Sequence, residues 1–263
     1  MTTGKPRVKL SRLILLVVIA SSTSRALTPE EKTLVDKARA QYYNLQASGF
    51  DSLTCNVVFD FNSIPFANLD DELKNSLKSS TLVLTIDSRG RTTVDKTLSA
   101  TTPNAVTAQA TQLLSVMQSL VSGVFQTWPT KGLTGPIPPF DRQINHVKTT
   151  SDGYVFDLNV PGAPVLITTD KAFITKSISS IGGMTIETTT YTPSEHGLIF
   201  AGTHALNKNT DGSEIEVEYS LSTQEIEGLA VPASVHLVVK PNIDARYSLE
   251  SCKAKKSQVI KLQ

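Results

Sequence analysis

The sequence lacks several features that would assign a function directly. Its 25 basic and 24 acidic residues nearly cancel, so it offers no strongly basic surface for nucleic acid. It has no Gly-x-Ser-x-Gly elbow and no glycine-rich phosphate loop. Its 4 histidines are scattered without the close spacing of zinc ligands. We therefore expect no metal, no cofactor and no enzymatic activity; a secreted hydrolase without a recognisable motif stays open as an alternative.

Long apolar runs are absent except near the N-terminus. There, basic residues in segment 5–12 precede a short apolar run, residues 13–20, and small residues follow at Ser24 and Ala26. This order is typical of a secretory signal peptide, and the run is too short to anchor the chain across a bilayer. We expect residues 1–26 to be a signal peptide, with an uncleaved N-terminal anchor as the alternative. The mature chain would then be periplasmic or extracellular, without a transmembrane segment.

Removal of the signal peptide would make the chain mildly acidic. The segment carries five basic residues and no acidic ones, which leaves 20 basic against 24 acidic residues and a net charge of −4. Such a balance gives no electrostatic affinity for nucleic acid, so we expect no nucleic-acid partner.

Cysteine is rare, with Cys55 and Cys252 as the only two. In an oxidising compartment an isolated pair usually forms a bridge. Strand alternation argues against one here, because Cys55 shares a face with Val57, whereas Cys252 shares a face with Arg246 and Glu250. A β-bulge or a strand end would reconcile the two faces, and we predict the disulfide.

Charge is absent from residues 97–130, where a long helix is predicted. Thr102 and Pro103 are typical of a helix start, and apolar residues then recur at spacings of three and four until Trp128. A surface helix normally carries Lys and Glu on its wet side. This helix is therefore expected either to be covered on both sides as part of the core or to form a lid over a cavity.

The rest of the chain predicts shorter helices and many strands. Residues 28–49 favour a helix, since Thr28, Pro29 and Glu31 fit a capping box with proline at the first position. Further elements are expected as a strand at 53–61, a helix at 68–79, a hairpin at 80–98 and, from residue 141, strands ending at 249 and joined by short turns. Alternating apolar residues indicate an antiparallel meander with one dry face.

One segment of this meander imitates a calcium-binding loop. Asn207, Asn209, Asp211 and Glu218 match much of the spacing of that loop. However, Asp211-Gly212 is also a standard hairpin turn, and strand alternation follows it. We therefore expect a hairpin and no metal site.

The order of elements resembles that of the lipoprotein-carrier superfamily, the LolA-, LolB- and LppX-like periplasmic proteins. The resemblance covers residues 28–252 and includes the segment Ala38–Leu45 and the turn Glu227–Pro232 before a late strand. It implies an unclosed barrel whose inserted helices cover an apolar cavity. These carriers hold the lid with a basic residue on an early strand, and the first predicted strand here has no Lys or Arg, so no site residue is carried over.

Together these observations predict an α+β protein, a mostly antiparallel β meander forming an unclosed (half) barrel with an N-terminal helix and inserted lid helices. We expect one domain at 27–252, a basic tail at 253–263 and a monomer. The expected function is an exported soluble binding protein or carrier for a lipid, an acyl chain or a lipidated protein. The alternative is a cell-envelope structural or protein-interaction module with a filled core. The candidate cavity residues are Leu82, Leu84, Leu113, Met117, Leu120, Val124, Phe156, Leu158, Val217 and Leu237.

Overall fold

A computed structural model of the chain describes residues 26–63, 66–159, 165–180, 185–209 and 211–257. The predicted signal peptide lies outside the described residues except for Ala26, and so does the end of the predicted basic tail.

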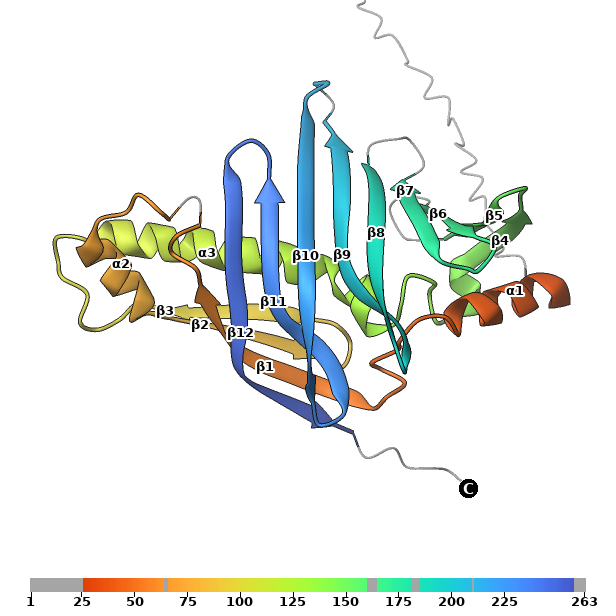
Figure 1. Cartoon of the computed structure of the whole chain (residues 1–263), viewed down its shortest axis with the longest axis horizontal. Coiled ribbons are helices and arrows are strands. Elements are labelled where there is room, and N and C mark those ends of the chain that lie inside the picture. The colour runs from red at the N-terminus through yellow and green to blue at the C-terminus, as the bar shows by residue number, and fades with distance from the viewer. Residues whose placement is uncertain (1–25, 64–65, 160–164, 181–184, 210, 258–263) are drawn as a thin grey trace, which may run out of the picture.

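The described strands form one antiparallel 12-stranded sheet, in the order β3-β2-β1-β12-β11-β10-β9-β8-β7-β6-β5-β4. The sheet is not closed, because β3 and β4 form its two edges (Figure 1). This confirms the predicted α+β class with an unclosed antiparallel sheet. The strands are β1 (Phe50–Phe59), β2 (Thr81–Asp87), β3 (Thr92–Thr97), β4 (Ile144–Thr149), β5 (Gly153–Leu158), β6 (Val165–Asp170), β7 (Thr175–Ser180), β8 (Thr185–Ser194), β9 (Gly197–Lys208), β10 (Glu214–Ile226), β11 (Leu229–Val239) and β12 (Ile243–Lys256).

The first helix, α1 (Pro29–Arg39), begins with the predicted capping box. The backbone N–H of Thr28 donates to Glu31 Oε2 at 2.8 Å, and the backbone N–H of Glu31 donates to Thr28 Oγ1 at 3.2 Å. The prediction that this helix continues to Gly49 was wrong. Tyr42 instead forms a bridge with Leu198, and its hydroxyl contacts Thr175 far along the chain, so a tertiary contact ends the helical path.

The predicted short helix is α2 (Asp71–Lys78), capped by the side chain of Asp70. The long helix, α3 (Thr107–Thr127), begins later than predicted, and Thr102 does not cap it. Its N-cap is Val106, whose backbone N–H already donates to Pro103 O in a preceding turn. Among the described helices, none is long and apolar enough to cross a membrane.

α3 lies across one face of the sheet, behind β12, β11 and β10 in Figure 1, while β1 to β3 curve beneath it. Its buried residues line one side and contact the larger of two core clusters. The opposite side is exposed and uncharged; there the hydroxyls of Thr111, Ser115 and Ser119 donate to carbonyls one turn earlier. Of the two alternatives expected for this helix, coverage on both sides is therefore wrong, because solvent reaches its Ser/Thr side.

Both edges of the sheet are covered by helices. At β3, Gln118 of α3 donates to Val94 O at 2.5 Å, and Thr92 donates to Phe125 O at 2.8 Å. At β4, the backbone N–H of Val147 donates to Glu31 of α1 at 3.3 Å. These contacts give hydrogen-bond partners to edge groups that would otherwise face solvent or another strand.

The predicted disulfide is confirmed, and a β-bulge explains it. Thr54 pairs with Lys253 and Asn56 with Glu250, so Ser251 and Cys252 together face Cys55. Ser251 has a positive φ of 49°, which turns the strand and brings Cys252 to the face of Cys55. The bond Cys55–Cys252 joins residues 197 apart in sequence.

The last strand is longer than predicted. β12 runs to Lys256, because the end of this strand pairs with Phe50–Thr54 of β1. Residues 253–256 of the predicted tail therefore belong to this strand.

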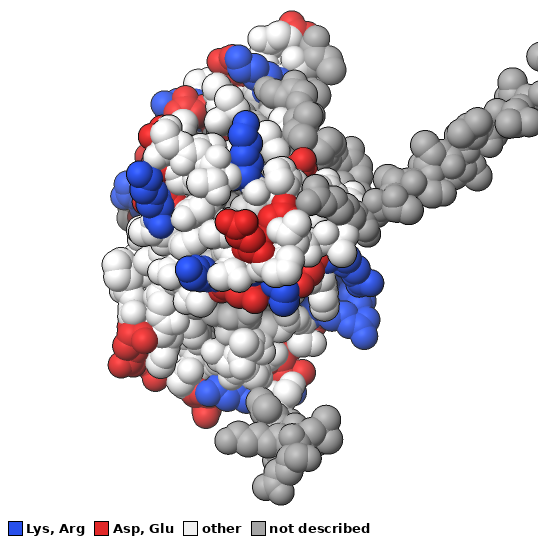
Figure 2. Space-filling view, turned by 90° about the vertical axis from the view of Figure 1, so that its right-hand side faces the viewer, with Lys and Arg blue, Asp and Glu red and all other residues white. Residues whose placement is uncertain are grey.

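The second core cluster lies between α1, the connector before β4, and strands β4 to β7. It includes Phe173, whose ring stacks on that of Tyr154 with centroids 4.5 Å apart. Acidic and basic side chains alternate over this end of the molecule, without a large area of one sign (Figure 2).

Candidate functional site: a cavity beside α3

A cavity of about 380 Å³ lies between the C-terminal half of α3 and the inner face of β8 to β11. We call it the first cavity. Leu120 and Val124 of α3 form one wall, and Val217, Leu237 and Val239 form the opposite wall. Its rim is open, since Gly123 is exposed to solvent. The space is therefore an apolar groove that an elongated ligand could enter from the side.

Small side chains create this space. A Cβ added to Gly123 would meet no atom within 4 Å. Across the cavity, β9 contributes Ala205 and Thr203, which face Val217 and Tyr219 of β10. Larger residues at Gly123 or Ala205 would fill the groove, so the sequence leaves it unfilled at these points.

A buried ion pair forms one end of the first cavity. Lys131 Nζ contacts Glu187 Oε1, and the two side chains are only 8% and 14% exposed. Glu187 also accepts a hydrogen bond from Thr203 Oγ1 at 2.5 Å, and the ammonium lies 5.8 Å from the centre of the Phe200 ring. Removing two charges from water costs free energy that well-packed apolar residues would avoid. The pair therefore marks this part of the cavity wall as the candidate functional site.

The local backbone places Lys131 in the cavity wall. A π-helical turn, Pro129–Leu133, follows α3, and the N–H groups of Lys131 and Gly132 both donate to Trp128 O. A Cβ at Gly132 would lie 2.4 Å from atoms of the Trp128 ring, so only glycine permits this close approach. The tight turn directs Lys131 toward the sheet.

Glu187 reaches the cavity by the alternation of β8. Thr185, Glu187 and Thr189 face inward on this strand, whereas Ile186 is 48% exposed on the outer face. The inward face of β8 thus carries polar residues, although its outward face holds threonines as well as Ile186. This departs from the usual pattern of a sheet with one dry face.

Tyr219 adds a neutral hydroxyl to the wall. Its OH and Thr127 Oγ1 are 3.1 Å apart. Burial raises the pKa of Tyr219 and the nearby Glu187 carboxylate raises it further, although the hydrogen bond with Thr127 lowers it. The phenol therefore stays protonated at physiological pH and can donate or accept a hydrogen bond.

A second cavity, of about 450 Å³, lies on the other side of the ion pair. Thr127, Lys131 and Glu187 line both cavities. The remaining lining of the second cavity is mostly apolar and includes Leu158, Val165, Ile167, Ile178, Pro136, Pro138 and Pro139. The amide oxygen of Gln143, which also lines this cavity, is buried and has no partner among the described residues.

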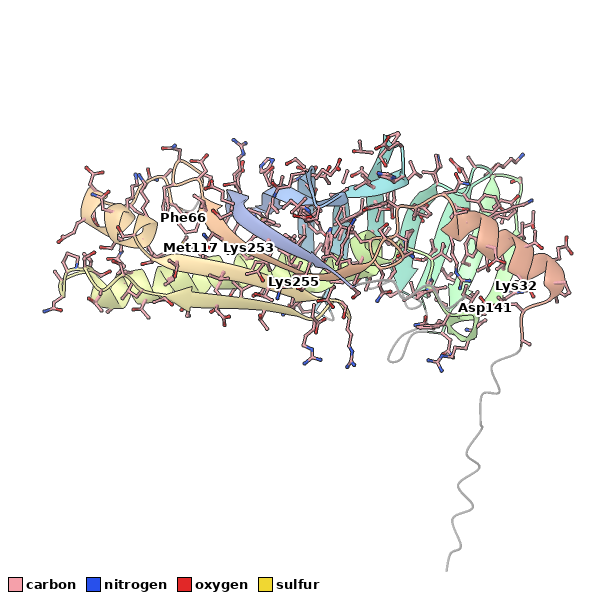
Figure 3. The ribbon with its side chains drawn as sticks, turned by 90° about the horizontal axis from the view of Figure 1, so that it is seen from below. Lys32, Phe66, Met117, Asp141, Lys253 and Lys255 are labelled. Carbon is pink, nitrogen blue, oxygen red and sulfur yellow. A yellow bond between two sulfur atoms is a disulfide. The ribbon has the colours of Figure 1, made fainter. Side chains whose placement is uncertain are left out.

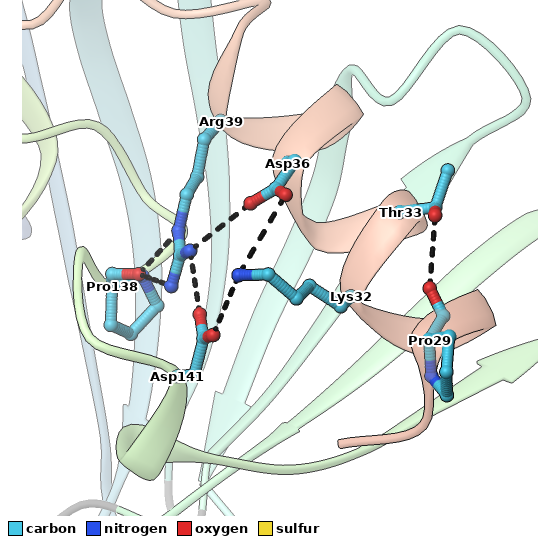
Figure 4. Close-up of polar contacts among 7 residues, drawn as sticks. All are labelled: Pro29, Lys32, Thr33, Asp36, Arg39, Pro138 and Asp141. Atoms are coloured by element: carbon cyan, nitrogen blue, oxygen red, sulfur yellow. Dashed lines mark hydrogen bonds and ion pairs between the residues drawn. The ribbon is translucent and has the colours of Figure 1, made fainter.

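The proline-rich wall of the second cavity is held in place by α1 (Figure 4). Arg39 donates from Nε to Pro138 O at 2.8 Å and from Nη1 to Asp141 at 2.8 Å, and Lys32 also pairs with Asp141 at 3.1 Å. The hydrogen bonds from Arg39 and Lys32 hold the pKa of Asp141 below its usual range. The connector between α3 and β4 is thus held against α1.

The predicted cavity residues are divided among several places. Leu120, Val124, Val217 and Leu237 line the first cavity, and Leu158 lines the second. Leu82 and Met117 line a different, more polar hollow beside α2, and Figure 3 shows Met117 on the side of α3 near Phe66. Leu84 is fully buried in the larger core cluster and Phe156 in the second core cluster. Leu113 packs against the larger cluster.

Sequence reasoning missed Lys131 and Glu187, although a signal for Lys131 exists. It is the only charged residue between Lys96 and Asp141. A lone charge in such a stretch indicates a specific partner, because a solvated surface would normally carry several. Glu187 gave no comparable signal, since the residues around it are typical of an ordinary half-exposed strand.

The segment that imitates a calcium loop forms the hairpin between β9 and β10. Asp211 Oδ1 accepts hydrogen bonds from the N–H and hydroxyl of Ser213, as expected for a tight turn. Among the described residues, no group of three or more His, Cys, Asp or Glu side chains could hold a metal ion.

Comparison of the chain with models of known families, with curated proteins and with solved structures gave no match. The geometry of the two cavities and the ion pair between them is therefore the basis for assigning a function.

Proposed function

We propose that this protein is an exported binding protein that holds a lipid-like ligand with an apolar chain in the cavity beside α3. The observation that carries the proposal is the first cavity, whose walls combine Leu120, Val124, Val217 and Leu237 with an ion pair at one end. Its volume of about 380 Å³ lies within the range of ligand pockets. Each CH₂ group transferred there from water would contribute about 0.8 kcal/mol.

The N-terminal segment and the disulfide support export. A basic segment before a short apolar run is typical of a signal peptide, and bridges such as Cys55–Cys252 persist mainly outside the reducing cytoplasm. The mature protein would work in the periplasm or outside the cell. Intact-mass measurement of the secreted form should give a chain that begins at Leu27; a full-length cytoplasmic product would contradict export.

Ligand binding is testable at Gly123. We expect an alkyl probe with an uncharged, solvatochromic head to show a blue-shifted emission with the folded protein. Gly123→Phe would place a ring in the empty space and weaken probe binding by about tenfold or more. Gly123→Ala, the matched control, adds only a methyl group and should retain binding.

A second candidate is a cell-envelope interaction module with a filled core. The full burial of Leu84 and Phe156, both expected at a cavity, favours this alternative. It predicts no probe binding by either the native protein or Gly123→Ala, and no lipid in a native extract examined by mass spectrometry. Binding that Gly123→Phe leaves unchanged would remove the first cavity from the proposal.

A further inference from the structure

We propose that the Lys131–Glu187 pair selects a ligand whose polar group is uncharged and both donates and accepts hydrogen bonds, such as an acyl alcohol, a monoacylglycerol or a primary acyl amide. This inference rests on the proposed function and names the class of ligand that the same cavity takes.

The position of the pair makes it the polar end for either cavity. Lys131 and Glu187 are the only charged side chains among the described residues that line the first cavity, and the same is true of the second. A chain in either cavity would therefore place its polar group at the same ion pair. Thr127, shared by both linings, lies beside it.

The charges of the pair cancel, and this decides which ligand fits. A carboxylate would gain Lys131 as a partner but would also lie beside Glu187 in a site with little water. An ammonium group would meet the reverse problem at Lys131. Like charges brought together under these conditions cost more than the new pairing returns, and a charged head also loses its hydration.

A hydroxyl or amide group avoids both costs. It can donate a hydrogen to Glu187 and accept one from Lys131, because an ammonium has three donors and a carboxylate about four acceptor positions. Neutral partners already surround the pair, namely Thr203 at 2.5 Å from Glu187 and the hydroxyl of Tyr219 in the same wall.

The experiment compares ligands of equal chain length and different charge. The uncharged solvatochromic probe is displaced by decanol, decanoate or decylammonium at neutral pH and below their micelle concentrations. For the native protein we expect decanol to displace the probe at a concentration about tenfold lower than either charged ligand.

Two substitutions should reverse the preference in opposite directions. Glu187→Gln leaves Lys131 without its carboxylate, so decanoate should become the best competitor. Lys131→Gln leaves Glu187 without its ammonium, so decylammonium should become the best. The matched controls are Glu216→Gln and Lys240→Gln, which change the same charges in an exposed pair whose atoms are 2.8 Å apart. These controls should keep the native order.

Each outcome separates the two proposals. Absence of probe binding by the native protein would overturn the proposed function. Probe binding with decanoate as effective as decanol, or with the order unchanged in Glu187→Gln, would overturn the present inference alone. Should a single variant fail to fold by circular dichroism, Lys131→Met combined with Glu187→Met replaces the pair by apolar side chains, which proteins often tolerate. That double variant should bind decane as tightly as decanol. A retained preference for decanol would also overturn the inference.

Discussion

Two regions of one sheet follow the same alternation but differ in the residues that one inward face carries and in the space that this face borders. At the disulfide end, which comprises β3, β2, β1 and β12 with α2, the inner face of β1 carries Leu53, Cys55 and Val57, all buried. In the cavity strands, β8 to β11, the inner face of β8 carries Thr185 and Glu187. Leu53 and Cys55 are close-packed in the core and Val57 borders the more polar hollow beside α2, whereas Thr185 and Glu187 border the first cavity.

The difference separates a cross-linked, closely packed region from one that borders a cavity. Apolar side chains at the disulfide end contact α2 and the N-terminal half of α3, and a covalent bond fixes β1 to β12. The cavity strands meet α3 where Gly123 leaves a gap. Positions that break the in-and-out rule without local benefit are typical of functional sites, and here they gather at the ion pair.

The largest expected effect comes from removing the covalent bond at the disulfide end. Cys55→Ala with Cys252→Ala should lower the free energy of unfolding by about 4 kcal/mol, because the bridge closes a very long loop and restricts the unfolded chain. Urea unfolding followed by circular dichroism measures this. Probe binding without urea should persist. A loss below about 1 kcal/mol would show that the two regions do not differ in this way.

A matched pair of leucines compares the packing directly. Leu84→Ala, in the close-packed region, should cost about 3 kcal/mol, since it leaves a new void in a rigid core. Leu237→Ala, in the cavity wall, should cost about 1.5 kcal/mol, because this side chain already lacks neighbours on one side. Equal losses in urea unfolding would mean that the cavity is filled.

Acid stability extends the comparison to the β4 edge. Hydrogen bonds, above all with the Thr28 backbone, lower the pKa of Glu31 from 4.5 to about 2. A depressed carboxyl pKa stabilises the folded state fully above pH 4.5, and this contribution is lost as the pH falls toward 2. Glu31→Gln should remove about 2 kcal/mol at neutral pH and flatten the stability profile in that window. Thermal unfolding at several pH values tests it, with exposed Glu30→Gln as the control that should keep the native profile.

The smallest effect is a gain in stability beside the cavity. Gly123→Ala should raise the free energy of unfolding by about 0.7 kcal/mol, because alanine restricts the unfolded chain and favours the helix. No atom lies within 4 Å of the added Cβ, so no clash offsets the gain. A decrease in urea unfolding experiments would indicate that this stretch of α3 is packed more closely than the structure indicates.

Local patterns predicted most elements, and long-range contacts account for the errors. The Thr28–Glu31 capping box and the hairpin of β2 and β3 depend on neighbouring residues, and both are present. The end of α1 depends on a hydroxyl contact between Tyr42 and Thr175, which lie 133 residues apart. The end of β12 depends on its partner β1. Such boundaries cannot be read from a local pattern.

The candidate site was predicted only in part for a similar reason. Periodicity placed Leu120, Val124, Val217 and Leu237 on apolar faces, and these residues line the first cavity. The same argument selected Leu84, which is fully buried in the close-packed core. Periodicity identifies the inner face of an element but does not say how well the space beside that face is filled. The partnership of Lys131 with Glu187 depends on how the turn after α3 meets β8, which only the tertiary structure determines.

The helices along the two sheet edges have a consequence for how a ligand could pass in and out. A barrel that closes on itself has no edge strands, but its interior is reached only through its ends. Here α3 at β3 and α1 at β4 protect the edges instead, so the sheet remains open along its length. A long chain could therefore enter broadside at Gly123, with no requirement to thread lengthwise or to unzip two strands.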